Sequence, residues 1–191
     1  MHHPMSISRS TAVALGAAAL VLSAGGAASA AGASHRDATG DAPTAASDIT
    51  RVVVKNGEKT LMVQAKLLRA SVGRTHVVVT LTPAAEGAAT YVVRTVEVGH
   101  RVGATLESTA VGATEATPLD CAGAKAAVSQ GRRGQVHVRV PQSCFGEDAG
   151  TLVAEVATQT TAQVETETPA EEESGVEDTA DETAPVEVEQ G

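Results

Sequence analysis

The stretch from Cys121 to Cys144 constrains this chain more than any other, because it holds the only two cysteines among 191 residues. Between them lie two short strand-like runs, separated by a Gly-Arg-Arg-Gly turn at 131–134. This pattern predicts a β-hairpin with a cysteine near each foot. A disulfide here would close a 24-residue loop, which is worth roughly 3 to 3.5 kcal/mol in the chain-entropy model. We therefore expect a disulfide-stabilised β domain in an oxidising compartment, where such bonds persist.

The turn chemistry of this hairpin predicts its register. A two-residue loop of Arg132 and Arg133 would need a positive φ at both arginines, which is unfavourable. A three-residue loop that adds Gly134 in the left-handed region places Val138 opposite Val128 and keeps the valines on one face. The alternation of apolar residues and the turn chemistry agree in this register, so we predict a three-residue loop with Val138 opposite Val128.

The feet of the hairpin must leave the ladder before the two cysteines can meet. Pro141 is the natural place for this break, because proline has no N–H to donate to a neighbouring strand. An alternative for residues 122–129 is a short helix, because Ala and Lys favour that state.

Residues 1–30 have the pattern of a secretory signal peptide. Arg9 precedes an apolar run that is too short to span a membrane, and the segment ends in Ala28-Ser29-Ala30, a small-x-small cleavage pattern. No cysteine follows the run, which excludes a bacterial lipoprotein anchor. We therefore expect a secreted, extracellular protein without a membrane span in its mature chain.

The net charge of −9 is distributed unevenly along the chain. Residues 163–191 hold eleven acidic residues and no Lys or Arg. Without that tail and Arg9, twelve acids face thirteen bases, so the remaining domain is nearly neutral. A nucleic-acid-binding domain would show a concentrated basic face. We therefore expect no nucleic-acid partner.

Short runs of β-branched residues recur about every ten residues from Asp48 to Thr158. The predicted strands are residues 49–55, 60–68, 76–82, 91–98, 104–111, the two arms of the cysteine hairpin, and 151–158. About eight short strands at this spacing are typical of an antiparallel β-sandwich, with a barrel as the alternative. The inward faces predicted by alternation are Leu61, Val63, Ala65 and Leu67, then Val77, Val79 and Leu81, and finally Leu152, Ala154 and Val156.

The two ends of the mature chain have a different composition from the strands. Residues 31–47 are rich in Ala, Gly, Ser, Thr and Asp and should form an extended leading segment. Residues 159–191 mix Glu, Thr, Ala, Pro and Val without a core-forming period. Low hydrophobicity with a run of one charge sign cannot offset the entropy of ordering, so we predict a disordered acidic tail.

Three carboxylates lie near the start of the first strand, at Asp37, Asp41 and Asp48. Oxygen-rich loops of this kind can bind Ca²⁺, a hard cation that takes six to eight oxygen ligands. The spacing is not that of an EF-hand. The alternative is that the aspartates only order the loop through Asx-turn hydrogen bonds. No other cofactor is indicated.

No arrangement of residues predicts a catalytic site. The histidines lack the paired spacing of a zinc site, and there is no Gly-x-Ser-x-Gly elbow. A basic edge formed by the outward residues His137 and Arg139 with Arg132 and Arg133 is the candidate recognition surface. The turn at 130–135 is the only candidate for an inhibitory loop.

Two blocks of sequence resemble a group of small secreted actinobacterial proteins. The blocks are Asp37-x-x-Gly40-Asp41 with Asp48-Ile49-x-x-Val52-x-Val54-x-Asn56, and Val136-x-Val138-x-Val140-Pro141-x-Ser143-Cys144-Phe145-Gly146 preceded by Cys121-x-Gly123. The resemblance implies an all-β extracellular domain, broadly like carbohydrate-binding and DOMON-like sandwiches, and it transfers no activity. The chain departs from this group in lacking tryptophan and in its long acidic tail.

These observations together predict an all-β, antiparallel sandwich over residues 48–158. We expect a monomeric, non-catalytic binding or interaction module with an extracellular or cell-envelope partner. The alternative is a secreted enzyme inhibitor, or an enzyme without a recognisable motif.

Overall fold

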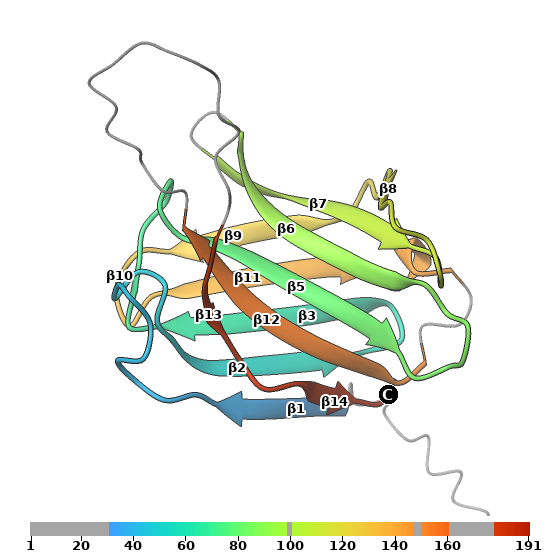
Figure 1. The fold of residues 1–191 in the computed structure, drawn as a ribbon, viewed down its shortest axis with the longest axis horizontal. Coiled ribbons are helices and arrows are strands. Elements are labelled where there is room, and N and C mark those ends of the chain that lie inside the picture. The colour runs from blue at the N-terminus through green and yellow to red at the C-terminus, as the bar shows by residue number, and fades with distance from the viewer. Residues whose placement is uncertain (1–30, 99–100, 147–149, 161–177) are drawn as a thin grey trace, which may run out of the picture.

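Two antiparallel β-sheets pack face to face in the computed structural model, which describes residues 31–98, 101–146, 150–160 and 178–191 (Figure 1). The five-stranded sheet has the order β1 (Ala31–Arg36), β2 (Ile49–Asn56), β3 (Thr60–Leu67), β11 (Gln135–Pro141) and β9 (Lys125–Ser129). The seven-stranded sheet has the order β13 (Asp178–Glu182), β12 (Leu152–Thr160), β5 (His76–Pro83), β6 (Thr90–Val98), β7 (Arg101–Thr109) and β8 (Thr117–Leu119), and β14 (Val186–Val188) also pairs with β12. The predicted all-β, antiparallel sandwich is confirmed.

The core fills the space between the sheets because one face of each main strand is apolar. Residues predicted to face inward on the strands at 60–67, 76–83 and 152–160 are at most 2% exposed. They pack with Ile49, Val52 and Val54 of β2 and with the valines of β11 in one continuous cluster. The period of two therefore assigned these faces correctly.

The described residues contain more strands than the eight or so that the pattern predicted. The additional ones are β1, the two-residue strands β4 (Arg69–Ala70) and β10 (Gly131–Arg132), β8, β13 and β14. The leading segment was predicted only to be extended; its first six residues form β1, which pairs with β2 along its whole length. These strands lie at sheet edges or are only two or three residues long. Their sequences therefore show little alternation of apolar and polar residues, which is why the pattern did not predict them.

The cysteine hairpin forms with a register two residues away from the predicted one. Val138 lies opposite Ala126, and Val136 lies opposite Val128. The predicted register was therefore wrong, but a shift of two residues leaves every side chain on its predicted face. The helix alternative was wrong as well, because residues 125–129 form β9.

Tertiary pairing of the turn explains the shift. Gly131 and Arg132 pair with β4, so the hairpin loop spans residues 130–134. Gly131 and Arg133 have positive φ angles. Gly134 was predicted to be left-handed, and this was wrong. Gly134 is required for another reason, because a Cβ there would lie 2.4 Å from the Cβ of Ala70.

The two cysteines form the predicted disulfide, with their Cα atoms 5.7 Å apart. The ladder of β11 ends at Pro141, as predicted, and a 3₁₀ turn, η1 (Gln142–Cys144), carries the second cysteine away from the sheet. Phe145 follows directly and is buried. Its ring meets that of Tyr91 edge-on at 5.1 Å, and the Tyr91 hydroxyl donates to the Phe145 carbonyl at 2.8 Å.

The acidic tail was predicted to be disordered from residue 159 onward, and this was wrong for residues 159–160, which belong to β12, and for residues 178–191. These last residues form β13 and β14 against β12, and β14 lies beside β1 at the edge of the sandwich (Figure 1). Val186 and Val188 are 6% and 3% exposed, and the chain end hydrogen-bonds to Asn56 and Glu58. The three-residue strand β14, with two inward valines, is too short to give a detectable alternation in a segment that is otherwise acidic. Residues 161–177 lie outside the described residues.

Asn56 connects this C-terminal segment to the rest of the core. The side chain is fully buried; its Nδ2 donates to the Gly150 carbonyl at 2.8 Å, and its Oδ1 accepts from Gln142 Nε2 at 2.6 Å. The Asn-Gly pair correctly predicted a hairpin between β2 and β3. The turn itself lies after this pair: Gly57 and Thr60 hydrogen-bond to each other and close it, so Glu58 and Lys59 are its central residues.

Among the residues that the structure describes, no helix is long and apolar enough to cross a membrane. The signal peptide predicted for residues 1–30 lies outside the described residues.

Candidate functional site

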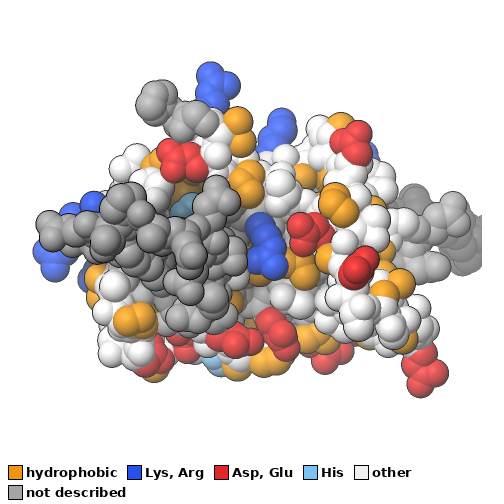
Figure 2. Space-filling model, turned by 45° about the horizontal axis from the view of Figure 1, so that its top comes forward, with side chains coloured by type: hydrophobic (Ala, Val, Ile, Leu, Met, Phe, Trp, Pro, Cys, Tyr) orange, Lys and Arg blue, Asp and Glu red, His pale blue; other side chains and the backbone are white. Residues whose placement is uncertain are grey.

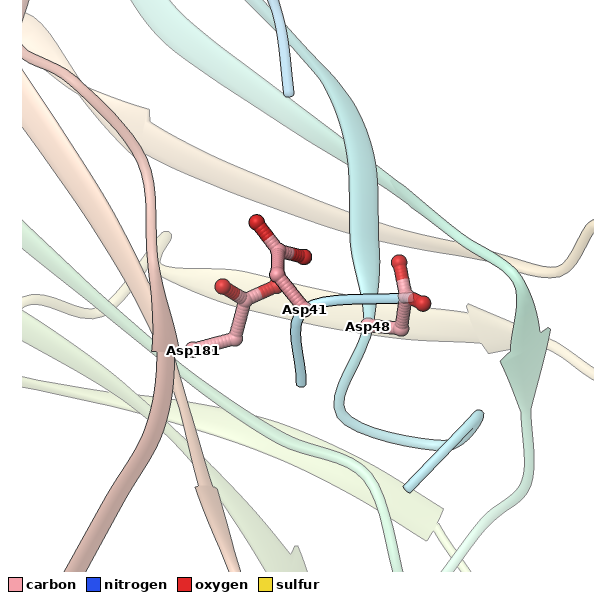
Figure 3. A group of neighbouring side chains, drawn as sticks. All are labelled: Asp41, Asp48 and Asp181. Carbon is pink, nitrogen blue, oxygen red and sulfur yellow. The ribbon is translucent and has the colours of Figure 1, made fainter. Parts of the chain in front are cut away.

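Three carboxylates from distant parts of the chain converge at one end of the sandwich. Asp41 and Asp48 lie in the loop between β1 and β2, and Asp181 approaches from β13 (Figure 3). One carboxylate oxygen from each residue lies within 4.8 Å of the other two. Asp41 is exposed, Asp181 is partly buried and Asp48 is 2% exposed.

Backbone hydrogen bonds fix the loop that carries Asp48. Its N–H donates to the Thr44 carbonyl at 3.1 Å, and its own carbonyl accepts from the N–H of Leu68 at 2.9 Å. The neighbouring Ser47 carbonyl accepts from the Thr158 hydroxyl at 2.8 Å, which ties the loop to β12. These hydrogen bonds therefore hold the loop that carries Asp48 in a defined position against the sandwich.

Backbone N–H groups also orient the carboxylates themselves. Oδ2 of Asp48 accepts from the N–H of Gly40 at 2.6 Å, and Oδ2 of Asp181 accepts from the N–H of Ile49 at 2.7 Å. Oδ1 of Asp37 accepts from the N–H of Ala38 at 3.0 Å. The other oxygens of Asp48 and Asp37, Oδ1 and Oδ2 respectively, are buried without a hydrogen-bond partner.

The predicted calcium-binding set was Asp37, Asp41 and Asp48. The structure brings Asp41 and Asp48 together with Asp181, and Asp37 stands beside this group instead of inside it. Asp37 is still close enough for Asp41 and Asp48 to act on its charge. Sequence reasoning missed Asp181 because it lies in the segment that was predicted to be disordered.

Burial and mutual repulsion act on Asp37, beside the cluster, and on Asp181, within it. Burial raises the pKa of Asp37, and the charges of Asp41 and Asp48 raise it further against the opposing effects of the Ala38 N–H and His35. Burial also raises the pKa of Asp181, helped by the charges of Asp37 and Asp41 and opposed by backbone hydrogen bonds. Ionisation of Asp37 and Asp181 therefore costs stability in the folded chain.

This cost predicts how the metal-free protein responds to pH. The folded chain holds protons on Asp37 and Asp181 more strongly than the unfolded chain, so their contribution to stability falls as pH rises from 3.8 through the raised pKa values. In EDTA at pH 7, Asp181→Asn should therefore gain melting temperature relative to wild type, and this gain should shrink as pH falls toward 4. Thermal unfolding followed by circular dichroism at several pH values measures the difference. A gain that grows on acidification would contradict the prediction.

A second candidate site covers the outer face of the five-stranded sheet. Its fifteen outward positions form three rows that run across the strands, and we call them the basic face. The rows are Arg36, Arg51, Lys66, Gln135 and Ser129, then Ser34, Val53, Gln64, His137 and Ala127, and finally Gly32, Lys55, Met62, Arg139 and Lys125. Six of these positions are Lys or Arg, and none is Asp or Glu.

Like charges stand directly opposite one another on this face. Arg51 lies between Arg36 on one neighbouring strand and Lys66 on the other, and Arg139 lies opposite Lys125. Like charges in direct cross-strand pairs destabilise a sheet. These pairs therefore do not contribute to folding, and the face is the second candidate for a binding surface.

The predicted recognition edge is only partly brought together. His137 and Arg139 lie on the basic face, one partly buried and the other exposed. Arg132 and Arg133 are exposed in the turn between β9 and β11, where Arg132 pairs with Arg69 of β4. The candidate inhibitory loop contains this turn, and its backbone is tied to the sandwich by the β4–β10 pairing and by the bond from the N–H of Arg133 to the Leu68 carbonyl.

Comparisons with models of protein families, with curated proteins and with solved structures find no match for this chain. The resemblance to secreted actinobacterial sandwiches therefore stays a prediction. The site has to be interpreted from its own geometry.

The opposite side of the molecule does not share this charge pattern. Figure 2 views the molecule from the seven-stranded sheet and the edge above it, and acidic and basic side chains are interspersed there. On that sheet Arg94 approaches Glu107 of the neighbouring strand at 3.8 Å. The one-sign face is thus a property of the five-stranded sheet.

Proposed function

We propose that this protein is an exported, non-catalytic binding module that docks through its basic face onto a linear cell-envelope polymer of phosphodiester-linked units. The observation that carries the proposal is the set of fifteen outward positions with six Lys or Arg residues and no acid. The predicted signal peptide supports export. The disulfide supports it as well, because such bonds persist in oxidising compartments.

The extent of the basic face favours a polymer over a small anion. Neighbouring strands lie about 4.8 Å apart and alternate residues along a strand about 7 Å apart, so the face measures roughly 20 Å by 14 Å. A single phosphate would contact two or three bases at most. A chain of repeated phosphates can lie along a whole row of bases and neutralise the repulsion between them.

Two further observations disfavour a lipid surface and a nucleic acid as the anionic partner. The large hydrophobic residues exposed in the described parts of the chain are Leu68, Val98 and Val111, and none belongs to the basic face. The large apolar side chains of the face, Val53 and Met62, are partly buried, so the face offers no fully exposed one for insertion into a lipid surface. Tyr91 and Phe145, the only aromatic residues, pack on each other, so no platform exists for the stacking of nucleic-acid bases.

Binding of long-chain inorganic polyphosphate to residues 31–191 tests the proposal. Replacing Lys125 and Arg139 together by Gln should weaken binding roughly 30-fold, because each base near an anionic surface contributes about 1 kcal/mol. The dependence of affinity on salt should become shallower as well, because fewer counterions are released. Isothermal titration calorimetry at several salt concentrations measures both effects.

A matched control carries the same change in net charge away from the face. Arg74 and Arg101 are exposed outside the basic face, and replacing both by Gln should leave the affinity nearly unchanged. The face variant should also melt at or above the wild-type temperature, because Lys125 and Arg139 no longer repel each other. Equal losses in the two double variants would contradict the proposal, as would tighter binding of poly-glutamate or of anionic vesicles than of polyphosphate.

A further inference from the structure

The carboxylate cluster lacks a Lys or Arg partner among the described residues, and only His35 acts as an opposing charge, on the neighbouring Asp37. Asp41, Asp48 and Asp181 place oxygens within 4.8 Å of one another, and Asp37 adds a fourth negative charge beside them. Among the residues that the structure describes, no Lys or Arg forms a salt bridge with any of the four. Like charges held this closely raise the free energy of the fold unless a counter-charge lies between them.

A second observation points to a ligand, independently of the acidic character of the cluster. Asp48 is 2% exposed, yet its Oδ1 has no hydrogen-bond donor, and the same holds for the buried Oδ2 of Asp37. Buried polar atoms in folded proteins are almost always paired, because an unpaired one costs about 1 to 3 kcal/mol. The partner oxygen of each carboxylate is held by a backbone N–H, so the unpaired oxygens are fixed in place.

We propose that Asp41, Asp48 and Asp181 bind a Ca²⁺ ion, with Asp37 beside them, and that this ion ties the C-terminal segment to the loop before β2. Ca²⁺ is a hard cation that accepts carboxylate, carbonyl and water oxygens in irregular geometry. Mg²⁺ demands near-octahedral geometry and keeps most of its water, and the cluster has no sulfur or imidazole ligand that would favour Zn²⁺.

The connectivity of the three ligands gives the site a structural consequence. Asp41 and Asp48 precede β2, whereas Asp181 lies more than 130 residues later, on β13. An ion that contacts all three binds only when β13 is docked on β12. Ca²⁺ would therefore stabilise the docked C-terminal segment, including the buried valines of β14, by mass action.

Calcium titration of residues 31–191 after treatment with EDTA tests the site. At a Ca²⁺ concentration of 100 times the Kd, the melting temperature should rise by about 5 to 10 °C. The Kd should fall between roughly 10⁻⁴ and 10⁻³ M, as in extracellular calcium modules. Hydrogen exchange of the amides at 178–182 should slow in the same range of concentration.

Charge-removing variants separate a metal ligand from a merely structural residue. Asp48→Asn and Asp181→Asn keep an oxygen for the backbone donors and should lose the calcium-induced rise in melting temperature. Glu187→Gln removes an exposed acid from β14 and should keep the full rise. If Asp48→Asn fails to fold, Asp181→Asn still decides the matter, because it should melt above wild type in EDTA and below it in Ca²⁺.

Several outcomes would overturn the proposal. One is no heat of Ca²⁺ binding together with an unchanged melting temperature, and another is an equal rise in wild type and in Asp181→Asn. An equal response to Mg²⁺ at the same concentration would overturn the assignment to Ca²⁺. A calcium-induced rise that leaves the exchange at 178–182 unchanged would overturn the role in docking. The polyphosphate experiment does not involve these residues, so the two proposals fail independently.

Discussion

A chain that ends after residue 177 is expected to lose about 5 kcal/mol or more of its stability. The truncation removes Val186 and Val188, and each buried valine contributes about 1.5 to 3 kcal/mol. It also removes the pairing of β13 and β14 with β12 and the hydrogen bonds between the chain end and the β2–β3 turn. The melting temperature should fall by about 10 to 20 °C, measured by calorimetry on residues 31–177 and 31–191.

A matched control separates packing from charge in this segment. Glu187 and Glu189 are exposed, so replacing both by Gln should change stability by less than about 0.5 kcal/mol. Val188→Asp should reproduce much of the effect of truncation, because it buries an unpaired charge against β12. If residues 31–177 melt within two or three degrees of the longer chain, the C-terminal segment does not belong to the folded unit.

Cys121→Ser is expected to lower stability by roughly 3 to 3.5 kcal/mol, the cost of releasing the 24-residue loop. For a unit of this size the melting temperature should fall by about 6 to 14 °C. The disulfide joins the segment before β9 to η1, next to the aromatic pair of Tyr91 and Phe145. Loosening η1 should therefore disturb that contact as well, which near-ultraviolet circular dichroism can detect.

The redox control for this prediction uses the same two proteins. A reducing agent should lower the melting temperature of wild type to about that of Cys121→Ser and leave the variant unchanged. Equal melting of oxidised and reduced wild type would show that the disulfide does not contribute to stability.

Much of the fold could be predicted from the alternation of apolar residues. The inward faces of β3, β5 and β12 follow directly from a period of two, because successive side chains on a strand point to opposite sides. The disulfide and the end of the ladder at Pro141 were also predictable. Each depends on a local property of one or two residues.

The register of the cysteine hairpin could not be predicted in this way. Local turn chemistry favoured Gly134 in the left-handed region, but the pairing of Gly131 and Arg132 with β4 lengthens the loop. The residues that provide this pairing lie some sixty positions earlier in the chain. The predicted faces survived because the shift is an even number of residues.

Both candidate sites required the tertiary structure for the same reason. Asp181 joins Asp41 and Asp48 only because β13 docks on β12, and the six bases of the basic face come from five strands between residues 31 and 141. Along the chain these bases alternate with buried valines and are separated by acidic loops, so the net charge of the domain averages to nearly zero.

The sequence by itself determined an all-β sandwich stabilised by the Cys121–Cys144 disulfide, because alternation, turn residues and cysteines act locally. Only the tertiary structure decided that the acidic C-terminal segment completes the sandwich, which residues form the carboxylate cluster, and that bases gather on one sheet. The physical reason is that cross-strand neighbours are set by register and sheet order. Those depend on contacts between residues far apart in the chain.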